Sequence, residues 1–174
     1  VVSHLRKYKN VIVMTKRIYQ TNGLTILGWP DPAGSGVDSL MPGNDELEAE
    51  AEAIRAYVEA AGVEIDLLAV HNRKLALAPM GIPVVLHGHD HIPAIIEEEG
   101  TVFVDAGTTG AAGVRGLGNS AIPYSVALLR FNLKGGKAHL AAVDLIRVFS
   151  RHGKFTLERT VIDEPISKQA VDKE

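Results

Sequence analysis

Two short, almost entirely apolar segments limit the fold of this chain more than any other feature. Ile65–Val70 and Val84–Leu86 each indicate a buried strand, and Arg73–Met80 between them has the character of a brief helix. A strand, a helical crossover and a second strand predict a β-α-β unit, in which the two strands run parallel. The sequence therefore predicts an α/β fold whose sheet is at least partly parallel.

The segments before this unit predict a long helix and a hairpin. Asp45–Ala61 is expected to be the helix, because apolar residues recur at helical spacing and Gly62 is a natural stop. Asn10–Thr15 and Leu24–Leu27 are expected to form the two strands of a hairpin about the turn signal Thr21–Gly23.

The second half of the chain is dominated by hairpin signals. Glu99-Gly100 and Gly135-Gly136 each separate two segments of strand character, and a further edge strand is expected near the end. Antiparallel hairpins joined to a parallel unit predict a mixed sheet. The strands expected in this half are Pro93–Glu98, Thr101–Asp105, Tyr124–Asn132, Lys137–Val148 and Phe155–Val161.

Composition narrows the class of protein. The 174 residues are 46% hydrophobic and 22% charged, with a net charge of −3, which indicates a globular domain without a nucleic-acid or anionic-membrane surface. The chain has no cysteine, so a metal would be held by nitrogen and oxygen alone. No apolar run approaches the roughly 20 residues that span a bilayer. We expect a soluble, cytoplasmic domain, although a start at Val1 leaves open a membrane anchor in a preceding segment.

Histidines gather directly after the second buried strand, where three of the seven in the chain lie within His87–His91. Imidazole is the commonest protein ligand for transition metals. If the two buried strands are parallel neighbours, His71 lies at the same carboxyl edge, where open α/β sheets place their sites. His71, His89 and His91 are therefore the candidate metal ligands, with polar strand ends as the alternative. His87 is expected to pack on the opposite face.

Other polar residues near this edge have two interpretations each. Asn72 and Asp90 either orient imidazoles or serve in turns. The glycine-rich stretch Gly107–Gly118 either cradles a phosphate or lines the mouth of the site. Arg115 within it either contacts a substrate phosphate or is a surface arginine.

Three segments together resemble the last motifs of the calcineurin-like metallophosphoesterases. Ala69–Asn72 matches a strand that ends in a lone His, and Leu86–His91 matches the Gly-His-X-His strand end. Val104–Gly110 matches the Asn/Asp-X-Gly-Ser/Thr loop of that family. The order and spacing of the set, rather than any one motif, carry the resemblance.

The resemblance extends over residues 11–131, because Gly23–Gly28 with Asp31-Pro32 is similar to the segment that these proteins carry between their third and fourth motifs. It implies the C-terminal half of a four-layer α/β sandwich with a mixed sheet. Residues 1–163 would belong to this domain, and 164–174 would be a polar tail.

The resemblance also implies a dimetal site and a reaction. His71 and His89 would bind the second metal and His91 the first. Two divalent ions, Mn, Fe or Zn, would bridge a hydroxide that attacks the phosphorus of a small phosphoester substrate. The family's first three motifs, Asp-X-His, Gly-Asp-X-X-Asp and Gly-Asn-His-Asp/Glu, are absent from the chain.

Without those motifs, the chain on its own is expected to be inactive. It would need the missing N-terminal half of the domain as a partner, and strand edges left bare by that half would favour self-association. One alternative is a non-catalytic metal- or phosphate-binding module of the same fold. Another is a nucleotide-binding α/β domain that uses the glycine-rich loop, although no phosphate-loop lysine follows it.

Overall fold

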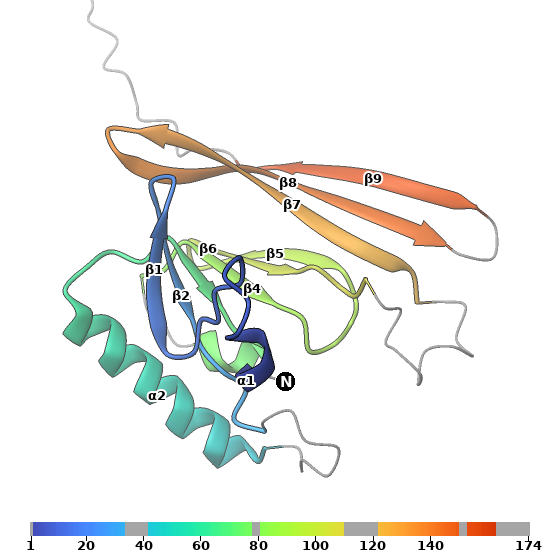
Figure 1. Cartoon of the computed structure of the whole chain (residues 1–174). Coiled ribbons are helices and arrows are strands. Elements are labelled where there is room, and N and C mark those ends of the chain that lie inside the picture. Colours follow the sequence, from blue (N-terminus) through green and yellow to red (C-terminus); the bar gives the residue numbers. More distant parts are fainter. Residues whose placement is uncertain (1, 34–41, 78–80, 110–121, 150–152, 163–174) are drawn as a thin grey trace, which may run out of the picture.

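The strands and one long helix of this chain form a layered α/β structure. The computed structural model describes residues 2–33, 42–77, 81–109, 122–149 and 153–162. A six-stranded mixed sheet has helix α2 on one face and a three-stranded antiparallel sheet on the other (Figure 1). The elements, in chain order, are α1 (Val2–Leu5), β1 (Arg17–Thr21), β2 (Leu24–Gly28), α2 (Asn44–Ala61), β3 (Leu67–Ala69), the 3-10 helix η1 (Arg73–Ala76), β4 (Val84–His87), β5 (Ala94–Glu98), β6 (Thr101–Asp105), β7 (Tyr124–Lys134), β8 (Lys137–Phe149) and β9 (Lys154–Val161).

The six-stranded sheet has the order β1-β2-β3-β4-β6-β5, in which the four central strands are parallel. The hairpin partners β1 and β5 run antiparallel at its two edges. β3 and β4 pair from Leu67 with Val84 to Ala69 with Leu86, and η1 lies in the connection between them. The predicted α/β class, the parallel pair and the mixed sheet are thus confirmed.

Two apolar clusters hold the layers together. On the helix side, Ile54 of α2 packs with Leu68 and Val85 of the sheet, and all three are at most 2% exposed. On the other side, Val104 packs with Val143 of β8, and neither is exposed to solvent. Because alternate residues of a strand face opposite sides, both faces of the central strands are buried, which explains their continuous apolar character.

The prediction that Asn10–Thr15 forms the first strand is wrong. The strand that pairs with β2 is the more polar β1, Arg17–Thr21. Asn22 and Gly23 both have positive φ and form a two-residue turn, so the residues that pair with β2 must follow directly on the other side of that turn. The apolar residues before β1 form no strand; Met14 lies against Gly28, whereas Ile12 is exposed.

None of the helices in the described part of the chain is long and apolar enough to cross a membrane. The assignment of 1–163 to one domain stays a prediction. The polar tail expected at 164–174 lies outside the described residues.

A carboxylate on the outer face of the three-stranded sheet ties its strands together. Asp144 of β8 is 2% exposed and accepts hydrogen bonds from Arg130 of β7, at 3.0 Å, and from Arg159 of β9, at 2.6 and 2.9 Å. These bonds, foremost that from Arg159, lower the pKa of Asp144 to about 2. One anion thus joins all three strands.

This ion network predicts a loss of stability in acid. A carboxyl whose pKa is depressed on folding contributes stability that is complete above its unfolded pKa of 3.8 and is lost as pH falls through about 2. We expect Asp144→Asn to unfold more easily than the wild type near neutral pH, and the gap to narrow as pH falls across that window. Thermal unfolding followed by circular dichroism measures this gap. Asp45→Asn, an exposed carboxyl on α2, should show no such change; a constant gap for Asp144→Asn would contradict the assignment.

Apolar side chains also line this outer face, which no described element covers. The register places Leu157 of β9 beside Ile146 of β8, which in turn pairs with Val126 of β7, and it places Phe155 beside Val148. Phe155 is 70% exposed and Leu157 is 56% exposed. β9 is an edge strand as well, and among the described residues no strand pairs with its outward backbone groups.

The expected self-association stays a prediction, and this face is where we expect it. A second copy presents the same edge and the same apolar stripe, so pairing of the two β9 edges would satisfy their backbone groups and packing of one outer face on the other would cover the stripe. Light scattering at increasing concentration should show a dimer for the wild type. Replacing Phe155 and Leu157 together by Ser should shift the protein to monomer, whereas Leu77→Ser, an exposed leucine elsewhere, should not. A wild type that stays monomeric would refute self-association.

Candidate metal centre

The backbone register brings two strand ends side by side at the carboxyl edge of the mixed sheet. Beyond the last paired residues of β3 and β4, Val70 N–H donates to the carbonyl of Leu86 at 2.9 Å. Gly88 N–H then donates to the carbonyl of His71 at 3.1 Å. The residue after Gly88 is therefore held next to His71, as the parallel arrangement predicts.

The side chains of His71 and His89 meet at this edge. Nε2 of His71 lies 3.1 Å from Nδ1 of His89, and the rings meet edge to face with centroids 5.0 Å apart. Two nitrogens bound to one metal at bond lengths of roughly 2.1 Å lie about 3.0–3.4 Å apart when they are cis or tetrahedral. The observed separation fits a shared cation, and it also fits an N–H···N hydrogen bond between two neutral imidazoles.

Asp31, which the sequence reasoning did not assign to the site, lies beside the same nitrogen. Its Oδ2 is 3.7 Å from Nε2 of His71. Gly28 of β2 pairs with Ala69 of β3, and Trp29 N–H donates to the carbonyl of Ala69 at 3.0 Å, so the loop after β2 passes the same edge. The signal that would have found Asp31 was its place just after a strand that is a parallel neighbour of the His71 strand.

His91 has a different environment. Its backbone φ is +58°, in the left-handed region that a non-glycine residue seldom adopts. Its Nδ1 is buried and has no hydrogen-bond partner within the described part of the chain, which is rare for a buried polar atom. The charge of His91 is one of the smaller influences on the pKa of Asp105, which burial raises overall. Strained backbone and unpaired donors of this kind occur at binding sites.

His87 and Asp105 form a buried pair below the edge. They are partners in the β4–β6 register, and their exposures are 9% and 1%. Nδ1 of His87 lies 3.5 Å from Oδ2 of Asp105, and burial lowers the pKa of His87 while it raises that of Asp105. The second carboxylate oxygen of Asp105 accepts the Gly107 N–H at 2.7 Å. His87 is buried, as expected for a residue that packs.

Hydrogen bonds hold the loop after Asp105 against the start of β7. Thr108 N–H donates to the Ser125 hydroxyl at 2.9 Å, and Ser125 N–H donates to the carbonyl of Thr108 at the same distance. Gly107 has a φ of +69°, and a Cβ there would lie 2.1 Å from Oγ of Ser125 and 2.9 Å from Pro93. Glycine is therefore required twice at this position, for conformation and for space.

This double requirement predicts unequal effects of two alanine substitutions. Gly100→Ala also adds a side chain at positive φ, +79°, but into open space, so it should cost about 1–2 kcal/mol. Gly107→Ala should cost a further 1–3 kcal/mol or so, because the methyl group collides with packed atoms. Denaturant unfolding curves give both values. If the two substitutions lowered the free energy of unfolding equally, the hydrogen-bonded contact between the loop and Ser125 would not be rigid.

The other residues that the sequence assigned to the site have different surroundings. Asn72 uses its side-chain oxygen to cap η1, accepting Lys74 N–H at 3.0 Å. Asp90 is exposed, and its charge raises the pKa of both members of the His87–Asp105 pair. Arg115 lies outside the described residues, together with positions 110–118 of the glycine-rich stretch, so the role expected for each stays a prediction.

The donors at this edge make an incomplete site. Within the described residues, no group of three or more His, Asp or Glu side chains is arranged to hold a metal ion. Two neutral nitrogens and one nearby carboxylate oxygen are donors that suit a divalent cation. They fit part of such a site, and the assignment of His71, His89 and His91 as ligands stays a prediction.

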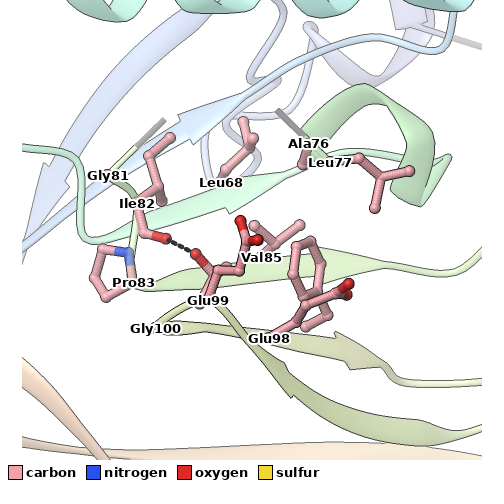
Figure 2. A pocket seen from close by; sticks show the side chains of 12 residues that line it. Leu68, Ala76, Leu77, Gly81, Ile82, Pro83, Val85, Glu98, Glu99 and Gly100 are labelled. Carbon is pink, nitrogen blue, oxygen red and sulfur yellow. Dashed lines mark hydrogen bonds between the residues drawn. The ribbon is translucent and has the colours of Figure 1, made fainter. Parts of the chain in front are cut away.

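A pocket of about 480 Å³ lies away from these histidines, at the opposite edge of the sheet. It lies on the helix-side face near the starts of β4 and β6, and Leu68, Ile82 and Val85 are among the residues that line it (Figure 2). The Thr101 hydroxyl donates to the carbonyl of Ile82 at 3.0 Å, and both residues line the pocket. Glu98 and Glu99 at the rim give it an acidic mouth, which does not favour a phosphate ligand.

Comparison with known proteins gives matches among solved structures only. No protein-family model matches the sequence, and comparison with curated proteins gives no match. Wild-type Vps29 from Entamoeba histolytica, complexed with Zn²⁺, matches 84% of this chain at 15% identity and a TM-score of 0.43. Vps29 from Cryptosporidium parvum matches 85% at 16% identity and a TM-score of 0.40.

GAP50 from Plasmodium, the anchor in the inner membrane complex, matches 85% of this chain at 12% identity and a TM-score of 0.41. The chain spans 53–60% of the length of these three proteins. Because the TM-scores are low, the description of the fold rests on the sheet order and packing given above.

Proposed function

We propose that this chain is the second half of a calcineurin-like metallophosphoesterase domain, a hydrolase of small phosphoesters that is completed by a first half. The observation that supports it most is the approach of Nε2 of His71 and Nδ1 of His89 to 3.1 Å at the carboxyl edge of parallel strands. That edge is where folds of this class bind their ligands. The ordered motifs of the sequence add to this support.

In this proposal the histidines serve two divalent ions, Mn, Fe or Zn. His71 and His89 hold one, and His91, whose buried Nδ1 has no hydrogen-bond partner among the described residues, serves the other. Bound ions of this kind supply an activated water and neutralise the phosphoryl oxygens. The chain's own contribution is to hold the two strand ends that carry His71 and His89 side by side through the backbone bond between His71 and Gly88.

The donors present explain why the chain alone should not turn over substrate. Neutral imidazoles leave the charge of two divalent ions largely unbalanced, and the aspartates of the family's first motifs are absent from this sequence. The partner that we propose is therefore the first half of the domain. It would bring the bridging carboxylate and the remaining ligands to the same sheet edge.

The purified chain tests both parts of this proposal. With Mn²⁺ or Zn²⁺ and bis(p-nitrophenyl) phosphate, we expect no hydrolysis above the rate of metal alone. After chelator treatment, isothermal titration calorimetry should still show binding of the metal. His89→Ala should weaken it by at least tenfold, whereas His139→Ala, an exposed histidine on β8, should leave it unchanged. Metal binding that is indifferent to His71 and His89 would refute the assignment.

A non-catalytic metal- or phosphate-binding module is the second candidate function. The observation that favours it is that the described donors form an incomplete site. The two candidates differ in what the gene encodes before Val1. An upstream segment with the Asp-X-His and Gly-Asn-His-Asp/Glu motifs that restores hydrolysis when joined to this chain would support the enzyme. An upstream segment without them would support the binding module.

A further inference from the structure

We propose that a groove at the amino edge of the six-stranded sheet, where β3, β4 and β6 begin, binds a small amphipathic cation. The ligand class is a free aliphatic amine, in which an apolar chain ends in an ammonium group. The groove has a volume of about 920 Å³ and lies at the edge opposite the candidate metal centre. The proposal does not depend on a bound metal or on the proposed hydrolase activity.

Two contacts hold the turn of the β7–β8 hairpin at this edge. Lys137 at the start of β8 pairs with Glu64 before β3, and its Nζ lies 2.6 Å from Oε2 and 2.9 Å from Oε1. Leu133 near the end of β7 lies against the β1–β2 turn, where a Cβ added at Gly23 would be 2.9 Å from Cδ2 of Leu133. The hairpin turn is therefore attached to the mixed sheet at two points, and it forms one wall of the groove.

Both walls of the groove carry apolar side chains. Val84 and Val102 line it from the starts of β4 and β6, and they are 1% and 5% exposed. Phe131 and Leu140 line it from β7 and β8. All four belong to the apolar cluster between the two sheets, so the groove is an opening into that cluster. Its volume lies within the range of roughly 300–1,000 Å³ that is usual for small-molecule sites, and an aliphatic chain suits such a lining.

The charges at the rim favour a cation. Among the described residues that line the groove, the carboxylates are Glu64, Asp66 and Glu97, and the one lysine is Lys137. With His139 counted as neutral, the carboxylates outnumber the lysine by two. Lys137 is already paired with Glu64, whereas Glu97 is exposed and has no hydrogen bond or ion pair with another described residue. This excess of negative charge attracts an ammonium group and repels a carboxylate or a phosphate.

The competing explanation is a groove that takes any apolar group. In that case the chain alone would determine affinity, and octylamine, octanol and octanoate would bind alike. If the rim reads charge, octylamine, which is protonated at neutral pH, binds best, octanol binds less tightly and octanoate binds worst. If the apolar lining contributes as well, n-butylamine binds more weakly than n-octylamine, because its shorter chain buries fewer methylene groups.

The experiment is calorimetric titration of the metal-free 174-residue chain with these four compounds at pH 7 and low salt. Amide chemical shifts measured in parallel locate the bound chain. We expect n-octylamine to bind at least tenfold more tightly than octanoate and than n-butylamine, with the largest shifts at Val102, Ala138 and Leu140.

Two variants of equal charge change test the role of the rim. Glu97→Gln alters an exposed side chain, and it should weaken octylamine binding about two- to fivefold while leaving octanol binding unchanged. Glu46→Gln, on the exposed surface of α2 and outside the groove, should leave the affinities for all four compounds unchanged.

Three outcomes would overturn the proposal. The first is no binding of n-octylamine. The second is equal affinity for the three eight-carbon compounds or no effect of Glu97→Gln, either of which would leave an unselective apolar groove. The third is a set of shifts confined to the outer face of the three-stranded sheet, which would place the bound chain elsewhere. Because no metal is present, none of these outcomes bears on the proposed metal centre.

Discussion

The parallel pairing of β3 with β2 on one side and β4 on the other is the constraint on which the candidate centre depends. Each pair ends with its partners level, so the three following loops leave the sheet at one edge. His71, His89 and Asp31 come from those three loops and are far apart in sequence. The apolar clusters on both faces keep the three strands in register. The packing of the core therefore also sets the geometry at the sheet edge.

Much of this arrangement could be predicted from the pattern of residues. The long helix, the parallel pair and the later hairpins follow from periodicity and glycine turns, and all are present. The error at Asn10–Thr15 has a physical cause, since an edge strand needs backbone pairing more than apolar side chains. Arg17–Thr21 satisfies that need because it adjoins the turn at Asn22.

The candidate site was predictable only in part. Histidines at strand ends are visible in the sequence, and the parallel unit implies that His71 and His89 approach each other. The position of Asp31 depends on which strand lies beside β3, and that neighbour is chosen by packing over a long sequence separation. The burial of His87 against Asp105 likewise follows from the β4–β6 register, which no local pattern encodes.

The strands of the three-stranded sheet differ in how many pairing and buried contacts hold them. β8 is paired on both sides and buries Val143 and Leu145 completely or nearly so, whereas β9 is bonded to β8 alone and is largely exposed. Two sets of side-chain bonds add to its backbone ladder, those from Arg159 to Asp144 and that from Arg147 of β8 to Glu158. Local opening of a protein begins where few buried contacts must be broken. β9 should therefore detach and reattach while the rest of the fold stays intact, and its amide hydrogens should exchange with solvent before those of β8.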